Sequence, residues 1–485
     1  MCRMCRMFPY KLFGSWISVL ILGLLVFSSS GAGTQEGRWQ GAPVDFSQGH
    51  LRVSADGHHL QFANGNGFFF LGDTAWEMFH RLKRAEMETY LEDRRSKGFT
   101  VIQAVVLAEF DGLTQANAEG NLPLVGSDPE HPNEKYFELV DYAVRTARTK
   151  GMYVGMLPTW GDKMGPVLLG KGPVIFNEKN AYAYGLFLGR RYAKDANVIW
   201  ILGGDRMPTE HELVWRAMAK GLRAGDKGRH LITYHPGGGK SSSDGFANAD
   251  SPLDFNMMQS GHGSRHFANY AMIEKDYALK PLKPTVDGEA RYEDHPVNFK
   301  AENGWFIDAD SREAAYWAVF AGSAGFTYGC HDIWQFLDTS RNQPVTFART
   351  PWQQALNFPG SMQMLYLRRL MESHDFLRLV PAQEMVVAAE ELPESGELLH
   401  VAALKHSDGR VALIYVPAGV LQVTVDMNSV AGGDVTSRWF DPTTGRSFPA
   451  VAMQEEAPGT FRLPMPAPGN GHDWVLVMEA VLHKK

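Results

Sequence analysis

Short apolar runs alternate with amphipathic segments over most of the 485-residue chain. The run TVIQAVVLA at 100–108 is rich in β-branched residues and has the length of a buried strand. The segment 133–151 places Phe137 and Val140 at helical spacing, and Gly151 ends it. Eight such runs are predicted as strands: 68–76, 100–108, 152–160, 198–205, 230–236, 255–262, 284–293 and 326–334.

The segments that separate these strands predict helices, except for a polar stretch at 241–254 that contains no strong helix. Eight strands alternating with helices over about 300 residues are typical of an α/β fold, the parallel (β/α)8 TIM barrel. A doubly wound open sheet is the alternative. It is disfavoured because no glycine-rich phosphate fingerprint follows the first strand. The predicted helices span 84–98, 133–151, 177–197, 210–226, 267–279, 311–325 and 352–373.

The pattern changes beyond about residue 376. Short runs of alternating apolar and polar residues, such as VLQVTVDM, are separated there by Gly, Pro, Asp and Ser. This texture predicts a small all-β sandwich. We therefore expect a catalytic (β/α)8 barrel at 34–375 and a C-terminal β-sandwich domain at 376–485.

The first 33 residues have the pattern of an export signal. Three basic residues precede an apolar run at 16–27, and small residues follow at 28–33. The apolar run is shorter than the roughly 20 residues that a transmembrane helix needs. We expect a signal peptide at 1–33, a secreted or periplasmic protein, and no stable membrane insertion after cleavage. A short uncleaved anchor is the alternative.

Composition narrows the function classes. The net charge of −7 argues against a nucleic-acid surface, which usually needs a strong basic excess. Cys330 is the only cysteine outside the expected signal peptide, so an intramolecular disulfide is excluded in the mature chain. A packed core thiol is the simpler interpretation of Cys330, because no His/Asn signature accompanies it.

Polar and aromatic residues gather at one end of the predicted strands. Barrel enzymes place their catalytic groups at the C-terminal strand ends, so this recurrence predicts an active site there. Each residue alone could also be a loop cap or a turn residue. In strand order the candidates are Asp73 and Trp76, Glu109, Trp160, Asp205, His235, His262, then Glu289, Arg291 and Tyr292, and finally Trp334.

Asp205 and Glu289 are the candidate catalytic pair. Glycoside hydrolysis needs one carboxylic acid to protonate the leaving oxygen and a second carboxylate to attack or to activate water. Many retaining barrel glycosidases take the acid/base from the fourth strand and the nucleophile from the seventh, where Asp205 and Glu289 stand. Asp205 could instead cap a helix or pair with Arg206, and Glu289 could pair with Arg291. A carboxyl separation of about 5 Å would indicate retention, and about 7 Å or more inversion.

The remaining candidates are assigned to substrate binding. Trp76, Trp160, Tyr292 and Trp334 could present ring faces to a sugar, although core packing is the alternative for each. His235, His262 and Arg291 could bind hydroxyls, or orient Glu289 and lower its pKa. Three carboxylates are the substitutes if either catalytic assignment fails: Asp73, Glu109 and Asp287.

Other chemistries are less well supported by the motifs. His211 and Glu212 are followed by Trp215 where the zinc-protease pattern HExxH needs a second histidine. Neither a G-x-S-x-G elbow nor a phosphate-binding loop occurs, and the histidines lack metal-ligand spacing. We therefore expect neither a metal nor another cofactor.

Four segments carry a family resemblance: LRVSADGHHLQFANGNGFFFLGDTAWEMFHRL, VIQAVVLAEFDG, NVIWILGGDRMP and PTVDGEARYED. Together they resemble the apiosidase-like enzymes of glycoside hydrolase family 140, from about residue 51 to 373. The tail, with SRWFDPTTGR, resembles a small C-terminal domain that carries a collagen-binding label. We discount that label, because no sequence feature indicates a collagen groove.

The resemblance implies a barrel with an Asp after strand four and a Glu after strand seven, which Asp205 in GGDR and Glu289 in GEARYE match. It also implies cleavage of the branched pentose apiose from side chains of rhamnogalacturonan II, a plant cell-wall pectin. Ala290 is a departure, because Pro often follows the Glu in this family, and its ring would restrict the backbone φ. Two alternatives are a barrel glycosidase on another plant polysaccharide and a non-catalytic carbohydrate-binding protein. The presence of both carboxylates argues against the latter.

Overall fold

The computed structural model shows where the predicted elements lie. Among the residues that the structure describes, no helix is long and apolar enough to span a lipid bilayer. The signal peptide expected at 1–33 lies outside the described residues, so it stays a prediction. The structure describes residues 37–165, 172–207, 209–391, 399–430, 434–449, 453–466 and 471–481.

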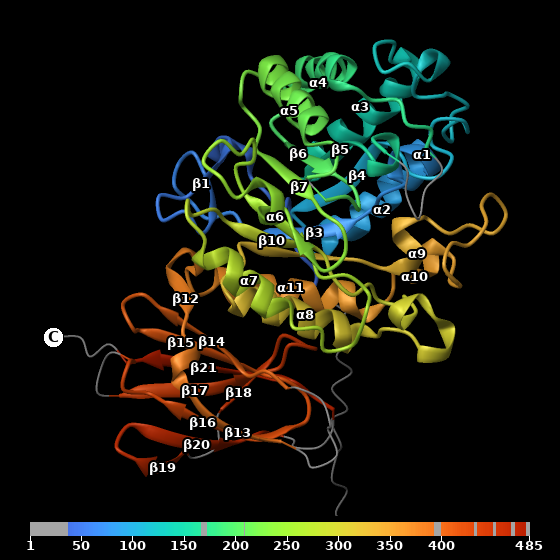
Figure 1. Ribbon diagram of the computed structural model, residues 1–485. Coiled ribbons are helices and arrows are strands. Elements are labelled where there is room, and N and C mark those ends of the chain that lie inside the picture. The colour runs from blue at the N-terminus through green and yellow to red at the C-terminus, as the bar shows by residue number, and fades with distance from the viewer. Residues whose placement is uncertain are drawn as a thin grey trace, which may run out of the picture. The chain divides into compact units, whose positions relative to one another are not determined.

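Eight parallel strands form the barrel (Figure 1). Each pairs with its neighbour in the order β7-β6-β5-β4-β3-β11-β10-β9, and a short strand, β8 (Lys240–Ser241), adds antiparallel to β9. The first and last of these eight also meet, because Thr233 Oγ1 donates a hydrogen bond to Phe255 O at 2.8 Å. The predicted TIM barrel is confirmed. Its strands are β3 (Phe70–Thr74), β4 (Val101–Leu107), β5 (Tyr153–Thr159), β6 (Val198–Gly203), β7 (Ile232–His235), β9 (Asn256–Gln259), β10 (Thr285–Glu289) and β11 (Gly325–Tyr328).

Helices follow the strands along the chain. A small hairpin, β1 (Leu51–Val53) and β2 (Leu60–Phe62), precedes the barrel. The region predicted as one helix at 352–373 is two helices, α10 (Trp352–Ala355) and α11 (Pro359–Glu372). The others are α1 (Met78–Arg81), α2 (Arg84–Ser96), α3 (Glu134–Thr149), α4 (Glu178–Tyr192), α5 (Glu212–Asp226), α6 (Ser243–Phe246), α7 (Asn269–Ala278), α8 (Asp308–Phe320) and α9 (His331–Trp334). The bounds of α2, α3, α4, α5, α7 and α8 agree with the predicted helices to within five residues, whereas the one-turn helices α1, α6 and α9 were not predicted.

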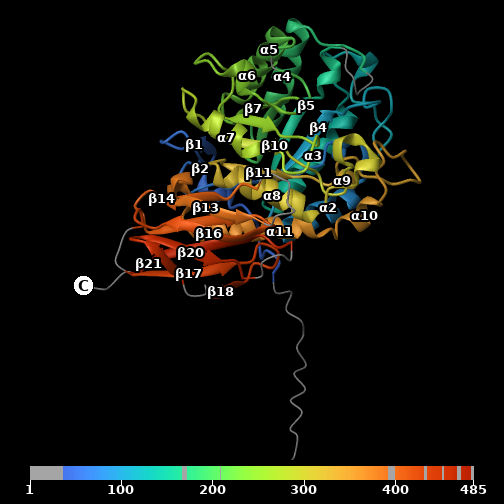
Figure 2. The ribbon, with the colours of Figure 1, turned by 60° about the horizontal axis from the view of Figure 1, so that its bottom comes forward.

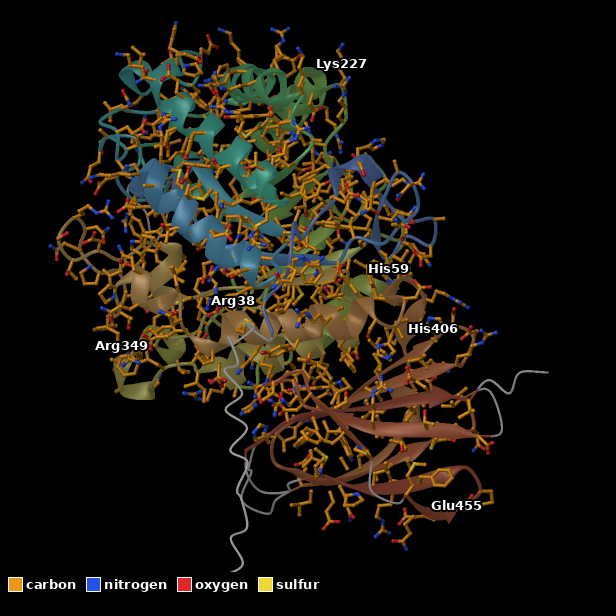
Figure 3. All side chains as sticks on the ribbon, turned by 180° about the vertical axis from the view of Figure 1, so that it is seen from behind. Arg38, His59, Lys227, Arg349, His406 and Glu455 are labelled. Carbon is orange, nitrogen blue, oxygen red and sulfur yellow. The ribbon has the colours of Figure 1, made fainter. Side chains whose placement is uncertain are left out.

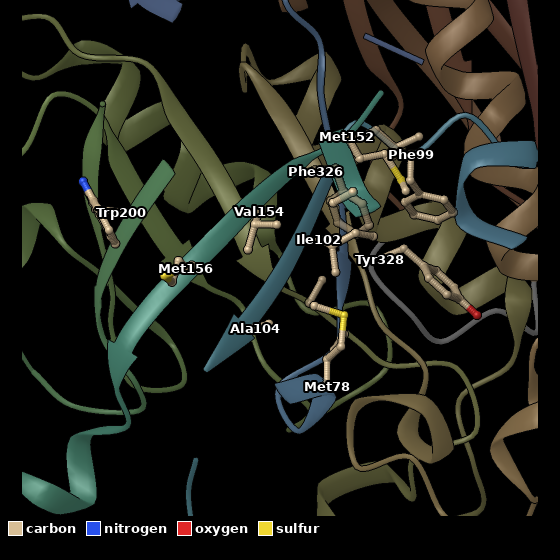
Figure 4. Packing of buried hydrophobic residues seen from close by; sticks show 14 of the residues in the cluster. Met78, Phe99, Ile102, Ala104, Met152, Val154, Met156, Trp200, Phe326 and Tyr328 are labelled. Atoms are coloured by element: carbon tan, nitrogen blue, oxygen red, sulfur yellow. The ribbon is translucent and has the colours of Figure 1, made fainter. Parts of the chain in front are cut away.

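Alternation along the strands separates two hydrophobic layers. In β4, Val101 and Val105 face the barrel interior, whereas Ile102 and Ala104 belong to the layer between strands and helices (Figure 4). Successive side chains of a strand point to opposite faces, and both faces of a barrel strand are buried. This explains why the predicted strands are continuous apolar runs.

Each predicted strand is longer than the observed one, and two run at least four residues past the observed end. The seventh ends at Glu289 rather than at 293, and the eighth ends at Tyr328 rather than at 334. Residues 331–334 form α9 instead, where Trp334 N donates to Cys330 O at 3.1 Å. Short apolar runs do not distinguish a strand end from a helical turn, which is why the prediction ran on.

The C-terminal region is a β-sandwich, as predicted, although the predicted domain limits stay a prediction. Its two antiparallel sheets have the orders β12-β14-β15-β21-β17-β18 and β13-β16-β20-β19. Ile414 of the first sheet and Val423 of the second share one hydrophobic cluster, so the sheets pack face to face (Figure 2). The strands are β12 (Leu379–Pro381), β13 (Val386–Glu391), β14 (Ala402–His406), β15 (Val411–Val416), β16 (Val420–Asp426), β17 (Val435–Phe440), β18 (Ser447–Pro449), β19 (Gln454–Ala457), β20 (Thr460–Pro464) and β21 (Trp474–Ala480).

Candidate active site

Asp205 stands on a sharp turn at the end of β6. Gly203 and Gly204 have φ of 88° and 108°, and Asp205 itself has a left-handed φ of 54°. A Cβ on Gly203 would lie 2.2 Å from His235 O, and one on Gly204 would lie 2.8 Å from the Trp160 ring. Only glycine fits both positions. The turn therefore holds Asp205 in a strained backbone conformation of the kind that clusters at functional sites.

Glu289 reaches the barrel mouth because the strand pairing of β10 is irregular. Val286 faces the barrel interior, and Asp287 points outward, where Ser260 Oγ donates to it at 2.7 Å. Strict alternation would turn Glu289 outward as well. The register between β9 and β10 shifts between Asp287 and Glu289, and such a bulge re-aims a side chain.

Two histidines hold the Glu289 carboxylate. His262 Nε2 donates to Oε1 at 3.0 Å, and His235 Nε2 lies 3.0 Å from Oε2. Burial alone would raise the pKa of Glu289, but its contacts with His235 and His262 outweigh burial and lower the pKa to about 2. Glu289 is therefore a buried carboxylate that stays ionised over the whole neutral and mildly acidic range.

Asp205 has the opposite electrostatic character. Burial, followed by repulsion from the Glu289 charge, raises the pKa of Asp205 to about 6. His235 Nδ1 lies 4.0 Å from Asp205 Oδ1, and 35% of the Asp205 side chain is open to the pocket. One oxygen of each carboxylate lies within 4.8 Å of the other. The site thus pairs a carboxylate that is ionised with a neighbouring carboxyl that holds its proton more tightly.

Comparison with known proteins identifies the family. A family profile described as "Apiosidase-like, catalytic domain" matches residues 54–378, two thirds of the chain. The chain belongs to the apiosidase-like family of glycoside hydrolases. A second profile, "Putative collagen-binding domain of a collagenase", matches residues 380–479. The predicted resemblance is confirmed for both regions.

Solved structures agree with this assignment. A glycoside hydrolase of 32% identity superposes with a TM-score of 0.78 and covers 91% of this chain and 99% of its own. A glycoside hydrolase family 5 structure from Bacteroides vulgatus is 31% identical, with a TM-score of 0.80 and coverage of 90% and 95%. Another structure from that organism, 14% identical with a TM-score of 0.62, shares the fold. No curated protein matches the chain.

The two carboxyl groups of this glycoside hydrolase line a cavity of about 80 Å³ at the barrel mouth. Trp76 and Trp160 form one wall, with ring centroids 5.3 Å apart, and both contact His235. Tyr292 packs against His262 at 4.4 Å. The structure thus brings together most predicted site residues: Trp76, Glu109, Trp160, Asp205, His262, Glu289, Tyr292 and Trp334 line the cavity, and His235 lies buried behind Glu289.

Asp73 and Arg291 do not line this cavity. Asp73 is fully buried and pairs with Arg94 of α2 at 2.6 Å. Arg291 donates to Glu313 at 3.2 Å. Asp73 falls on the outward-facing side of the alternation in β3, whereas Arg291 lies beyond the end of β10 and is held outside the barrel mouth by Glu313. Their predicted contact with substrate finds no support in this geometry.

The structure adds cavity residues that the sequence did not indicate. Phe110, Phe299 and Thr346 have left-handed φ values of 55°, 60° and 47°, which are uncommon for residues with a Cβ. They stand on loops, where no hydrophobic period marks them. The others are Gln259, His295, His331 and Val345. Of these, Gln259 and His331 follow the strand-end pattern that predicted the rest.

The loop that carries Val345 and Thr346 is anchored beside the cavity. Arg349, which Figure 3 labels, donates from Nε to both oxygens of Asp294 at 3.0 and 3.1 Å. The backbone N of Arg349 also donates to Asp332 Oδ1 at 2.9 Å. These bonds hold one wall of the cavity against the ends of β10 and β11.

A larger cavity, about 500 Å³, adjoins the catalytic one across Glu109, Phe110 and Val345. Burial, together with the neighbouring carboxyl groups of Glu77 and Asp205, raises the pKa of Glu109 well above its usual value. The raised pKa favours the protonated form of Glu109, which can donate a hydrogen bond where the two cavities meet.

The enzyme could in principle hold a metal at the same place. Donor atoms of Asp205, His235 and Glu289 lie within 4.8 Å of one another, and they are the metal-capable group found among the described residues. However, His235 and His262 already contact both oxygens of Glu289. These contacts already balance the charge of Glu289, and we assign no metal to the group.

Proposed function

We propose that this enzyme hydrolyses a glycosidic bond with retention, using Glu289 as nucleophile and Asp205 as acid/base. The observation that carries the proposal is the pair itself. The two carboxylates approach to within 4.8 Å, and the pKa of one is lowered while that of the other is raised. Retaining glycosidases hold their carboxyl groups about 5–5.5 Å apart, which is too close for a water molecule between them and the sugar.

In the first step a Glu289 oxygen bonds to the anomeric carbon as the bond to the leaving oxygen breaks. Asp205 gives its proton to that oxygen, so the leaving sugar departs as an alcohol. In the second step Asp205 takes a proton from water, and the oxygen of that water displaces Glu289 from the anomeric carbon. Glu289 returns to its ionised form, and Asp205 is protonated again.

Charge coupling between the two groups suits this change of role. While Glu289 is ionised, its negative charge helps to keep the proton on Asp205. Once Glu289 is esterified, that charge is gone, and the pKa of Asp205 falls so that it can act as a base. His262 and His235 stabilise the carboxylate that leaves in the second step.

For the substrate we propose an apiosyl linkage in the side chains of the pectin rhamnogalacturonan II, on the strength of family membership. The small catalytic cavity, walled by Trp76 and Trp160, supports a single compact sugar ring next to the carboxylates. A polymeric plant substrate also fits export, and we propose that the protein acts outside the cytoplasm.

The substrate is tested by product release from apiose-bearing rhamnogalacturonan II oligosaccharides. We expect release at the apiosyl linkage by the wild type and none by Glu289→Gln. If the wild type is inert there, a panel of other plant polysaccharides decides between a different sugar and no hydrolysis at all. Saccharide binding without any product across the panel would contradict the proposed activity.

A further inference from the structure

Helix α8 contacts both the barrel and the β-sandwich. It follows β10 in the chain, and in Figures 1 and 2 it lies between the barrel strands and the sandwich. Trp317 Nε1 donates to His400 O at 2.8 Å, and the rings of Tyr316 and Tyr415 stack with centroids 4.8 Å apart. The sandwich therefore packs directly on a helix that belongs to the catalytic barrel.

Two residues in the first turns of α8 hold the segment that follows Glu289. Ser311 Oγ donates to Arg291 O at 2.9 Å, and Arg291 Nη1 donates to Glu313 Oε1 at 3.2 Å. Arg291 is 2% exposed. The backbone two residues beyond Glu289 is thus fixed by α8 through both a main-chain and a side-chain bond.

Arg312, between these two residues, points the other way into the sandwich. Its Nε donates to both oxygens of Asp473 at 3.0 and 2.9 Å, and Nη2 donates to Oδ1 at 2.6 Å. Tyr415 OH donates to Asp473 Oδ2 at 3.0 Å, and Arg312 Nη1 donates to Gln363 Oε1 at 2.7 Å. Both charged groups are buried, so each depends on the other for its stability there.

Apolar side chains also connect the barrel directly with the β-sandwich. A binding module on a tether would keep its own core and bury little against the barrel. Here one hydrophobic cluster runs from barrel residues such as Phe320 into the sandwich. The sandwich residues in it are Ala402, Leu404, Leu413, Tyr415, Phe440, Val475 and Val477.

We propose that the β-sandwich is a brace for the nucleophile. Asp473 fixes Arg312, which sets the position of the first turns of α8. Ser311 and Glu313 on those turns then hold the segment that carries Glu289. Arg312 and Asp473 are on this account positioning residues, which act on catalysis without touching substrate. The effect on activity rests on the proposed role of Glu289, but the mechanical coupling does not.

The coupling is tested by hydrogen–deuterium exchange of the full-length protein without substrate. In Asp473→Asn, which keeps the shape of the side chain, we expect peptides covering 284–293 to exchange about tenfold faster than in the wild type. Arg191→Gln is the matched control. Arg191 of α4 also joins two elements, because it donates to two carboxylates of α3, Glu134 and Asp141. It should leave exchange at 284–293 unchanged. Faster exchange confined to the sandwich and α8 would overturn the proposal.

A milder variant covers the case in which Asp473→Asn fails to fold. Tyr415→Phe removes one hydrogen bond to Asp473 and should accelerate exchange at 284–293 about threefold.

Kinetics on the oligosaccharide that the wild type cleaves then separates a positioning role from a purely stabilising one. We expect kcat to fall about tenfold in Asp473→Asn at constant KM. The acidic limb of the pH–rate profile should move to higher pH. Arg312→Lys, which keeps the positive charge beside Asp473, should lose less exchange protection at 284–293 than Asp473→Asn. Unchanged kcat and pH profile in folded protein would show a structural role only.

Discussion

The two strand ends that form the site are built differently. Glu289, at the end of β10, is 5% exposed and is contacted on both oxygens by histidines. Asp205, at the end of β6, sits on a left-handed turn after two glycines, and its nearest imidazole nitrogen is 4.0 Å away. The end of β10 stabilises the negative charge of Glu289, whereas the end of β6 leaves Asp205 able to give up and take back a proton.

This difference indicates how one barrel mouth supplies both an acid and an anion. A hydrogen bond from His262 and the close approach of His235 hold the charge on Glu289, whereas burial and a like charge keep the proton on Asp205. Pairs of titratable groups whose environments push their pKa values apart are typical of acid/base sites. Four variants and conditions, ordered by expected effect, would break or sharpen the contrast.

The largest effect is expected from Glu289→Gln, which removes the fixed charge. We expect kcat to fall by at least about ten-thousandfold, because no covalent intermediate can form. Steady-state and single-turnover kinetics measure the loss. Glu302→Gln, on an exposed residue, is the matched control and should retain full activity. Loss of less than tenfold in Glu289→Gln would remove Glu289 from the reaction.

Asp205→Asn should cost about a hundredfold to a thousandfold on natural linkages, because the leaving oxygen is no longer protonated. The loss should shrink on an aryl glycoside whose leaving group needs no proton. Added azide should restore turnover and give a glycosyl azide of the substrate's own anomeric configuration. Equal losses on both substrate types, with no azide product, would assign Asp205 a different role.

His262→Ala should lower kcat/KM about tenfold or more, since it removes one of the two contacts that position Glu289. The pKa of Glu289 should rise toward its ordinary value, so the acidic limb of the pH–rate profile should move to higher pH. His131→Ala, at an exposed site, is the control. An unmoved acidic limb would show that His262 does not hold the charge.

The pH profile of the wild type gives the smallest effect, about tenfold per pH unit on each limb. Activity needs Asp205 protonated, so kcat/KM should fall as pH rises through about 6. It also needs Glu289 ionised, so activity should persist in acid and fall only as pH approaches about 2. Asp205→Asn should lose the basic limb. A basic limb that persists in this variant would belong to another group.

The positions of the site residues on the barrel were largely predictable from the sequence. Glycines and polar residues after apolar runs marked the ends of β6 and β10, so Asp205 and Glu289 were predicted as the catalytic pair from their places on the fourth and seventh strands and from the family resemblance. Asp73 shows the limit of that approach. It ends a strand too, but alternation turns it outward to Arg94, and the bulge that turns Glu289 inward leaves no trace in the residue pattern.

The loop-borne part of the site could not be predicted. Phe299 and Thr346 line the cavity from segments whose backbone is left-handed at residues that rarely adopt it. Surrounding tertiary contacts impose such conformations, and local sequence preference opposes them. The sequence likewise did not show whether the sandwich binds glycan or braces the barrel, because Arg312 and Asp473 are 161 residues apart.

The most direct test of the paired-carboxylate mechanism is the anomeric configuration of the first product. Proton NMR can follow hydrolysis of an oligosaccharide that the wild type cleaves, before the released sugar mutarotates. The short separation of Asp205 and Glu289 predicts that the first-formed product keeps the configuration of the substrate. A first-formed product of inverted configuration would contradict the account, because a water molecule would then have to attack from the side that Glu289 is proposed to occupy.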